Sequence, residues 1–284
     1  MPAHSGRSQR VSLLDEDPDL CEGLPTAELE AARERALANV VELTPPSCDM
    51  DAICSQANPG WLGLFVLDGL LIRRVNIGRR STCELLGPTD VLRPWDADAD
   101  YAPLPLSLDW LVVKSTRLAL LDGGFMLRIA RWPQLTARIV SRLAHRARYQ
   151  ALARTVTHLP RADARLLMLF WLLAERWGTV STGGVYVNLP LTHDTLAMLV
   201  GAHRPTVTIA LQRLSRAGFL IRERSDRWLL TRAGIDSLEH ADSMRLIGGD
   251  TAIGDAAEDP DQDPLAARAD DQDDLLLPTP PPTA

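Results

Sequence analysis

Residues 180–232 read VSTGGVYVNLPLTHDTLAMLVGAHRPTVTIALQRLSRAGFLIRERSDRWLLTR, and this stretch decides the fold of the second half of the chain. Val185–Leu189 alternates apolar and polar side chains, which is typical of a strand buried on one face. Thr192 follows in the position of a helix N-cap, because its hydroxyl can accept a hydrogen bond from the first turn. Gly201 then predicts a tight turn into a second helix, which begins near Arg204-Pro205 because proline is tolerated in a first turn.

The second helix of this stretch has an apolar face and a polar face. Val207, Leu211 and Leu214 recur at spacings of four and three, which places them on the buried side. A hairpin of two short strands follows, at Phe219–Arg222 and Trp228–Thr231. Strand, helix, glycine turn, helix and hairpin, in this order, form the layout of a winged helix-turn-helix. The second helix of that motif fits the major groove of DNA, which is roughly 12 Å wide.

Charge is segregated along the chain, although the net charge is only −7. Residues 1–130 carry 12 basic and 19 acidic side chains, whereas residues 131–235 carry 16 arginines against 5 acids, a net charge of +11 without the histidines. Residues 236–284 have a net charge of −11. A basic segment between acidic ones favours a nucleic-acid-binding unit, because attraction to a polyanion depends on local charge. The alternative is an arginine-rich, solvated helix surface.

The first half of the chain shows a different pattern. In residues 61–122, short apolar or alternating runs are separated by turn residues such as Asp68-Gly69, which predicts several short strands in an antiparallel sandwich or barrel. Before them, a stretch rich in Ala, Glu and Leu predicts one helix from Pro25 or Thr26 to about Val41. The predicted fold class is therefore α+β, with a sheet domain followed by helices.

After Gly123-Gly124 the periodicity becomes helical. Phe125–Arg131 predicts a short helix, and Pro133 opens a helix that runs to about Leu159, before Pro160. A helix of this length measures about 39 Å at 1.5 Å per residue, too long for a small domain to cover alone. We therefore expect it to bury its apolar stripe against a second copy of the chain, and the alternative is packing against its own sheet. The stripe consists of Leu135, Ile139, Leu143, Leu152, Val156 and Leu159.

These patterns divide the chain into five segments. Arg161–Trp177 is amphipathic and predicts a further helix, which Gly178 ends. The residues from about Ile247 onward are rich in Asp, Ala and Pro and cannot bury enough apolar surface to offset chain entropy, so we expect disorder there. The predicted segments are an N-terminal extension with one helix (1–59), a sensor-like sheet domain (60–132), a long dimerisation helix (133–159), a winged helix-turn-helix domain (160–235) and an acidic, Pro-rich tail (236–284).

The winged stretch resembles the DNA-binding domain of the Crp/Fnr family of transcription regulators. The motifs that carry the resemblance are Leu191-Thr192, Leu196-Ala197, Leu199-Val200-Gly201, Arg204-Pro-Thr-Val207, Leu211-Gln-Arg-Leu214 and Gly218-Phe219-Leu220-Ile221. The upstream half of the chain resembles the same family at two places, the Gly87-Pro88-Thr89-Asp90 turn and the Ala119-Leu120-Leu121-Asp122 strand end. The resemblance covers about residues 60–232. It implies a jelly-roll sensor domain of the cyclic-nucleotide-binding type, a dimerising helix and a pair of winged helices on a palindromic site.

Two departures from the family pattern change what is expected. Where nucleotide-sensing members place a Gly-Glu pair and an Arg-Ser/Thr-Ala run, this chain reads Arg93-Pro94-Trp95 followed by acidic and Pro-rich sequence. We therefore expect the sensor domain to have lost the cyclic-nucleotide motif, and we expect no cofactor. The second helix carries Pro205 and Ile209 where the best-known members carry Glu and Arg that touch base edges. The operator should therefore differ from theirs.

The expected DNA contacts lie on the two helices and on the hairpin. By the resemblance, phosphate contacts are expected from His203, Thr206 and Thr192. Base reading or backbone clamping is expected from Arg204, Thr208 and Arg213, and the alternative for Arg213 is a solvated helix surface. The exposed face of the second helix adds Gln212. The hairpin adds Arg222, Arg224 and Arg227, which would hold flanking phosphates.

The four cysteines, Cys21, Cys48, Cys54 and Cys83, all fall in the sensor half. One branch of the resembled family holds an iron–sulfur cluster on four cysteines. Only Cys48 and Cys54 lie close together and no Cys-x-x-Cys pair exists, so the spacing is poor for a cluster and we expect no metal. The remaining alternatives are a redox-active thiol and buried thiols without a chemical role.

The sequence contains no enzyme motif: no glycine-rich phosphate loop, no His-Glu-x-x-His and no Gly-x-Ser-x-Gly. We predict a homodimeric transcription regulator that is not an enzyme, that binds duplex DNA and for which RNA polymerase is a candidate partner. Lys114 is the only lysine, which indicates a GC-rich, bacterial genome.

No apolar run approaches the roughly 18 residues that cross a bilayer, so we expect a cytoplasmic location without membrane association. The alternatives are a protein-interaction module built on the winged helix and a thiol-sensing regulator. Binding that weakens steeply with salt would indicate DNA, since each phosphate contact releases a counterion.

Overall fold

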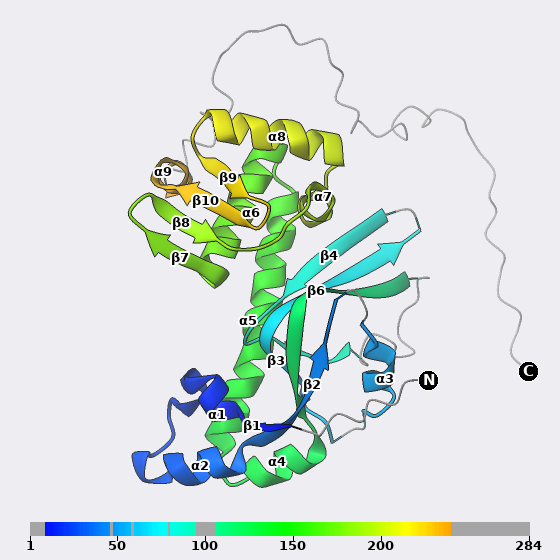
Figure 1. The fold of residues 1–284 in the computed structure, drawn as a ribbon, viewed down its shortest axis with the longest axis vertical. Coiled ribbons are helices and arrows are strands. Elements are labelled where there is room, and N and C mark those ends of the chain that lie inside the picture. Colours follow the sequence, from blue (N-terminus) through cyan, green and yellow to red (C-terminus); the bar gives the residue numbers. More distant parts are fainter. Residues whose placement is uncertain (1–8, 46–47, 58–59, 79, 95–105, 240–284) are drawn as a thin grey trace, which may run out of the picture. The chain divides into compact units, whose positions relative to one another are not determined.

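The computed structural model describes residues 9–45, 48–57, 60–78, 80–94 and 106–239. The predicted acidic tail beyond residue 239 and Trp95 of the Arg93-Pro94-Trp95 motif lie outside these residues. Within the described ranges the strands form two antiparallel sheets, against which the helices pack (Figure 1), so the predicted α+β class is confirmed. No helix of this part of the chain has the length and apolar character needed to cross a lipid bilayer.

The first sheet has the strand order β1-β2-β6-β3-β4, with β5 paired to β3 (Figure 1). Its strands are β1 (Arg10–Ser12), β2 (Leu37–Leu43), β3 (Gly63–Ile77), β4 (Arg80–Leu86), β5 (Val91–Leu92) and β6 (Leu106–Leu121). The prediction of several short strands is wrong for β3 and β6, because each joins two of the predicted runs into one long strand.

β3 passes through the predicted turn at Asp68-Gly69 without ending. The register between β3 and β6 shifts around these residues, and Gly69 has a φ of +96°. A Cβ on Gly69 would collide with Thr116, so this position requires glycine. The turn signal in the sequence therefore marks a β-bulge, which bends a strand instead of ending it.

The N-terminal residues belong to this sheet. The helix predicted to reach Val41 is too long, since the 3-10 turn η2 (Thr26–Glu28) and helix α2 (Leu29–Arg35) end before β2 begins. β2 pairs with β6 through the β-branched Val40 and Val41, a residue type that favours strands. The predicted boundary at residue 59 therefore divides one sheet. The other short elements here are α1 (Leu13–Glu16), η1 (Pro18–Cys21) and α3 (Met50–Cys54).

The long helix predicted over residues 133–159 is α5 (Pro133–Thr157), and α4 (Gly123–Ile129) precedes it. Leu135 and Ile139 are fully buried in the core that also contains Leu13 and Leu20 of the N-terminal segment. For these two residues and for Val156, the alternative of packing within the chain holds, whereas Leu152 of the same predicted stripe is 45% exposed. Small side chains occupy the exposed face of α5, at alternating spacings of three and four: Ala137, Val140, Ala144, Ala147 and Ala151.

The second sheet has the strand order β7-β8-β10-β9. Its strands are β7 (Gly178–Ser181), β8 (Gly184–Val187), β9 (Leu220–Arg224) and β10 (Arg227–Thr231). The helices around it are α6 (Ala162–Trp177), α7 (His193–Val200), α8 (Arg204–Arg216) and α9 (Arg232–Glu239). Strand, helix, turn, helix and hairpin thus follow in the predicted order, whereas β7 and α9 were not predicted.

The two sheets share one buried cluster. Leu70, Ile72 and Leu85 of the first sheet pack in the same cluster as Leu166 of α6 and Leu196 of α7. Each fully buried leucine contributes about 1.5–3 kcal/mol relative to an exposed one. The first sheet and the helices α6 and α7 are therefore held together by apolar contacts as well as by the connecting chain.

Candidate nucleic-acid interface

The start of α7 and the turn after it are set by local hydrogen bonds. The hydroxyl of Thr192 accepts a hydrogen bond from the backbone N–H of Thr195 at 3.1 Å, as an N-cap does. Gly201 ends α7 with a φ of +64°, the left-handed conformation that glycine adopts without strain. His203 then holds the N-cap position of α8 and is exposed. The predicted helix, glycine turn and helix are confirmed.

α8 presents one face to the core and the opposite face to solvent. Val207, Ala210 and Leu214 are at most 4% exposed. The exposed half of α8 carries no acidic residue; its exposed members are Arg204, Pro205, Ile209, Gln212, Arg213, Ser215 and Arg216. The predicted contacts Arg204, Gln212 and Arg213 are therefore all exposed, with Arg204 and Arg213 at the two edges of this half, whereas Thr206 is partly buried.

The hydroxyl of Thr208 is less available for contact with DNA than its position in the sequence suggested. Its hydroxyl donates to the carbonyl of Arg204 at 3.0 Å and shares a hydrogen bond of 2.9 Å with Nδ1 of His193 on α7. Partial burial and the positive charges of Arg222 and Arg204 lower the pKa of His193, so the imidazole is neutral at pH 7. His193 was not among the predicted site residues. Its place directly after the N-cap Thr192 was the signal available in the sequence.

The hairpin of β9 and β10 holds its arginines against the domain. The guanidinium of Arg222 lies 4.8 Å above the ring of Trp228 and donates from Nη2 to the carbonyl of Ser225 at 3.1 Å. The guanidinium of Arg227 lies 4.0 Å above the ring of Tyr186. Arg224 is exposed beside the turn. The hairpin therefore carries the three predicted arginines, two of which rest on aromatic rings, and Arg227 also pairs with Glu223 at 3.3 Å.

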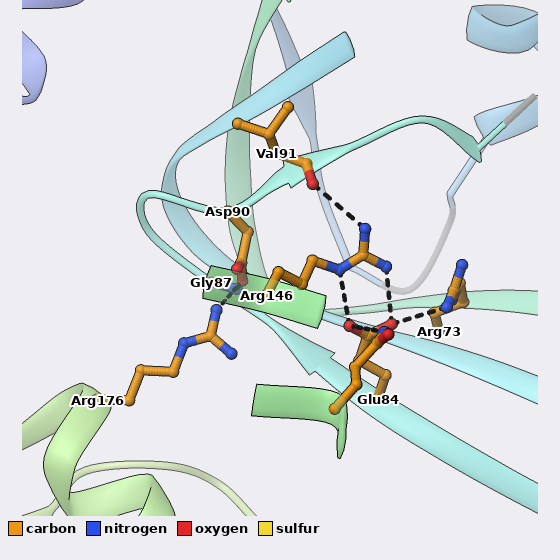
Figure 2. Close-up of polar contacts among 8 residues, drawn as sticks. Arg73, Glu84, Gly87, Asp90, Val91, Arg146 and Arg176 are labelled. Atoms are coloured by element: carbon orange, nitrogen blue, oxygen red, sulfur yellow. Dashed lines mark hydrogen bonds and ion pairs between the residues drawn. The ribbon is translucent and has the colours of Figure 1, made fainter. Parts of the chain in front are cut away.

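A buried ion-pair network joins the sensor sheet to α5. Glu84 on β4 accepts hydrogen bonds from Nε and Nη2 of Arg146 at 2.7 and 2.9 Å, and pairs with Arg73 at 2.9 Å. Arg146 also donates to the carbonyl of Val91 at 3.2 Å, so that its guanidinium lies between Glu84 and Val91 (Figure 2). The side chains of Glu84 and Arg146 are each only 12% exposed. Burial raises the pKa of Glu84, but the hydrogen bonds and charge of Arg146 outweigh it and hold that pKa below its ordinary value.

A second ion pair joins the sensor sheet to α6. Asp90 accepts a hydrogen bond from the backbone N–H of Gly87 at 2.8 Å and pairs with Arg176 (Figure 2). Burial raises the pKa of Asp90 above its ordinary value, although the charge of Arg176 opposes this. A Cβ on Gly87 would lie 2.9 Å from the ring of Trp177, so the turn and the end of α6 are in close contact. The Gly87-Pro88-Thr89-Asp90 turn therefore fixes α6 to the sensor sheet.

The four cysteines do not come together at one site. Cys21 packs against the N-terminal core, Cys48 and Cys54 against the core of the first sheet, and Cys83 against the core shared with α7. Burial raises the pKa of Cys48 to about 11 and that of Cys83 to about 12, so both remain thiols at neutral pH. Within the described ranges no group of three or more His, Cys, Asp or Glu side chains is placed to hold a metal ion.

The chain is similar to known regulators in sequence. Residues 164–238 match the model of the Crp-like helix-turn-helix domain. A relative from Mycobacterium tuberculosis, described as a CRP-like cAMP-activated global transcriptional regulator, is 29% identical over 174 residues, which are 59% of this chain and 75% of that protein.

Solved structures share the fold. A cyclic nucleotide-binding domain containing protein from Listeria monocytogenes matches with a TM-score of 0.55 at 17% identity, over 69% of this chain and 90% of that one. FixK2 from Bradyrhizobium japonicum matches with a TM-score of 0.51 at 17% identity, over 76% of this chain and 99% of that one. Each match covers more than two thirds of this chain, and together they confirm the predicted fold class.

Proposed function

We propose that the chain is a transcription regulator of the Crp/Fnr type that acts as a homodimer on a palindromic operator in duplex DNA. The observation that carries the proposal is the solvent face of α8, which combines Arg204, Gln212 and Arg213 with no acidic residue. This face has the size, charge and hydrogen-bonding groups that the major groove accepts.

In the proposed complex, α8 lies in the major groove and the surrounding groups hold the phosphates. Residues near the N-terminus of α8 are the ones that reach base edges in a helix-turn-helix. The backbone N–H groups at this helix end, together with Thr192 and His203, face the DNA backbone. Arg222, Arg224 and Arg227 on the hairpin contact phosphates beside the groove.

The proposed dimer forms through α5. The exposed residues Ala137, Val140, Ala144, Ala147 and Ala151 repeat at spacings of three and four, the spacing of residues that meet in a helix pair. Their small size lets two helices approach closely. Leu135, Ile139 and Val156 are buried within the chain, so the exposed row of small residues is the one we assign to the partner.

The first-sheet domain is proposed to bind an effector other than a cyclic nucleotide. The M. tuberculosis relative is cAMP-activated by its description, but here Arg93 donates to the main-chain carbonyls of Trp61 and Leu62, at 2.8 and 3.0 Å, which ties its guanidinium to the protein. Together with the loss of the family motif after Arg93, this favours a different ligand. Isothermal calorimetry with cAMP should show no binding heat.

The path from sensor to DNA is proposed to run through the connection between α5 and α6. Arg165 donates to the carbonyl of Leu159 at 2.5 Å and to that of Gly201 at 3.2 Å, so the connection is linked directly to the turn before α8. The ion pairs of Glu84 and Asp90 hold α5 and α6 to the sensor sheet. A shift of either helix would change the separation of the two recognition helices in the dimer.

Selection of random duplex DNA by the purified full-length protein, followed by sequencing, tests the proposal. We expect a palindrome whose half-sites are about 34 Å, or one helical turn, apart. Affinity for this operator should fall with rising salt, with a log–log slope set by the number of phosphate contacts. Retention of DNA without a motif would contradict sequence-specific regulation, and no retention would favour a protein-interaction module.

A charge-reversal pair provides the control for this selection. Arg213→Glu places a carboxylate on the proposed groove face and should abolish retention of the operator. Arg131→Glu makes the same change on the exposed connection between α4 and α5, where Arg131 is 64% exposed, and should leave retention intact. Equal losses in the two variants would indicate a general effect of charge and would count against α8 as the interface.

A further inference from the structure

The centre of the solvent face of α8 is partly apolar. Pro205, Ile209, Gln212 and Arg216 follow one another at spacings of four, three and four, directly opposite the buried row of Val207, Ala210 and Leu214. The side chain of Ile209 is 52% exposed. The middle of the face that we assign to the major groove therefore carries an isoleucine and a proline between its polar groups.

The fold does not require isoleucine at this position. Ile209 belongs to none of the buried clusters, and a β-branched side chain is a poorer helix former than alanine or leucine. Single exposed apolar residues are common on protein surfaces, so exposure alone does not indicate a function. Here the residue lies one helical turn from Gln212 and Arg213, where water would favour a polar side chain unless the face is covered.

The major groove presents one apolar group, the C5 methyl of thymine, among hydrogen-bond donors and acceptors. On the basis of the proposed function, we infer that Ile209, with Pro205 beside it, selects thymine in the operator through contact with this methyl group. Gln212, three residues further on, has the amide group that pairs with the edge of adenine. The central part of each half-site is therefore read as A·T pairs, by methyl contact from Ile209 and by hydrogen bonding from Gln212.

Replacement of thymine by deoxyuridine tests this inference, because it removes the methyl and keeps the base pair. Each thymine of the selected operator is replaced singly, and the dissociation constant is measured for the wild-type protein and for Ile209→Ala. At one position, deoxyuridine should weaken wild-type binding about fourfold, as expected for one buried methyl group. Ile209→Ala should bind the thymine and deoxyuridine operators equally at that position. 5-Methylcytosine placed in the same strand position should recover part of the methyl contact for the wild type only.

Val180→Ala is the matched control. Val180 is 83% exposed on β7 in the same domain but away from α8, so this variant should retain the full preference for thymine over deoxyuridine. Wild-type protein that binds every deoxyuridine operator as tightly as the parent operator would overturn the inference, while the selected motif itself would still stand. The inference would also be overturned if Ile209→Ala still bound the thymine operator more tightly than the deoxyuridine operator. Failure to select any motif would instead overturn the proposed function and this inference together.

Discussion

Glu84 is a buried carboxylate that forms ion pairs with two arginines, Arg73 and Arg146, and only 12% of its side chain is exposed. Glu84→Gln would leave the charges of Arg146 and Arg73 without their counter-ion in a poorly solvated site. Removal of one partner from such a pair destabilises a protein by about 3 kcal/mol. We expect a loss of this size in urea unfolding. The control is Glu30→Gln, whose partner is Arg33 and whose side chain is 80% exposed. It should cost less than about 1 kcal/mol, and equal losses would contradict the role assigned to Glu84.

The same carboxylate predicts a pH dependence. Burial raises the pKa of Glu84 and the interactions with Arg146 and Arg73 lower it, with a net value below 4.5. Ionised Glu84 therefore stabilises the folded state; the contribution is complete above the unfolded pKa and is lost as the pH falls through the lowered folded pKa. The gap in unfolding free energy between wild type and Glu84→Gln should be constant from about pH 7 to pH 5 and should shrink below about pH 4. A gap that stays constant into the acid range would contradict this assignment.

Arg204 stands in the first turn of α8 and is 67% exposed, with Asp194 at 3.7 Å. If it reads a base edge, Arg204→Ala should weaken operator binding by about 1–3 kcal/mol and leave binding to random DNA nearly unchanged. Competition binding with the selected operator and with scrambled duplex measures both quantities. Arg35→Ala, which removes an exposed arginine from α2, should change neither. Equal loss on both DNAs would make Arg204 a phosphate contact instead.

Among the elements, the turn between α7 and α8 depends on the backbone of Gly201. A Cβ there would lie no closer than 3.7 Å to its nearest neighbour, so the cost of substitution is conformational and not steric. Gly201→Ala should therefore destabilise the protein by about 1 kcal/mol, the cost of a left-handed residue with a side chain. Gly201→Asn should cost less, because asparagine tolerates this conformation. Thermal unfolding measures both variants, and an alanine variant as stable as wild type would refute the argument.

The elements that the sequence predicted well are those with strong local signals. α5, α6, α7 and α8 have periodic apolar residues together with proline, threonine or glycine at their ends, and the structure places them within a few residues of the predicted bounds. β2 was predicted as part of a helix because its pairing partner, β6, lies 73–81 residues further along the chain. Local patterns contain no information about such a distant partner.

Like the fold, the candidate site could be predicted from the sequence only where local patterns decide which residues are exposed. The exposed positions Arg204, Gln212 and Arg213 follow from helical periodicity alone, and the structure leaves all three exposed on α8. The hydrogen bond between Thr208 and His193 and the stacking of Arg222 on Trp228 depend on the packing of neighbouring elements. The ion pairs of Glu84 and Arg146 join residues 62 positions apart, and many other charged residues in the sequence were equally plausible partners.

For the molecule as a whole, the proposed assembly is a pair of chains joined at α5. Ala144 lies exposed in the middle of the row of small residues, so Ala144→Glu should leave the folded chain intact and place two carboxylates face to face in a dimer. We expect light scattering to give twice the chain mass of 31.2 kDa for wild type and the single mass for the variant, with much weaker operator binding. Gln134→Glu, on an exposed position off this row, should remain dimeric. A dimeric Ala144→Glu would place the interface elsewhere.

The placement of Arg222 over Trp228 has an optical consequence. The indole is 1% exposed, packs against Phe170 and has the guanidinium of Arg222 at 4.8 Å above its face. Tryptophan emission is sensitive to a charge held near the ring, and Arg222 is also a candidate phosphate contact. If Arg222 leaves the indole to contact a phosphate, as proposed, the wavelength of the Trp228 emission should shift when operator DNA is added. An unchanged Trp228 emission on saturation with DNA would contradict a movement of Arg222.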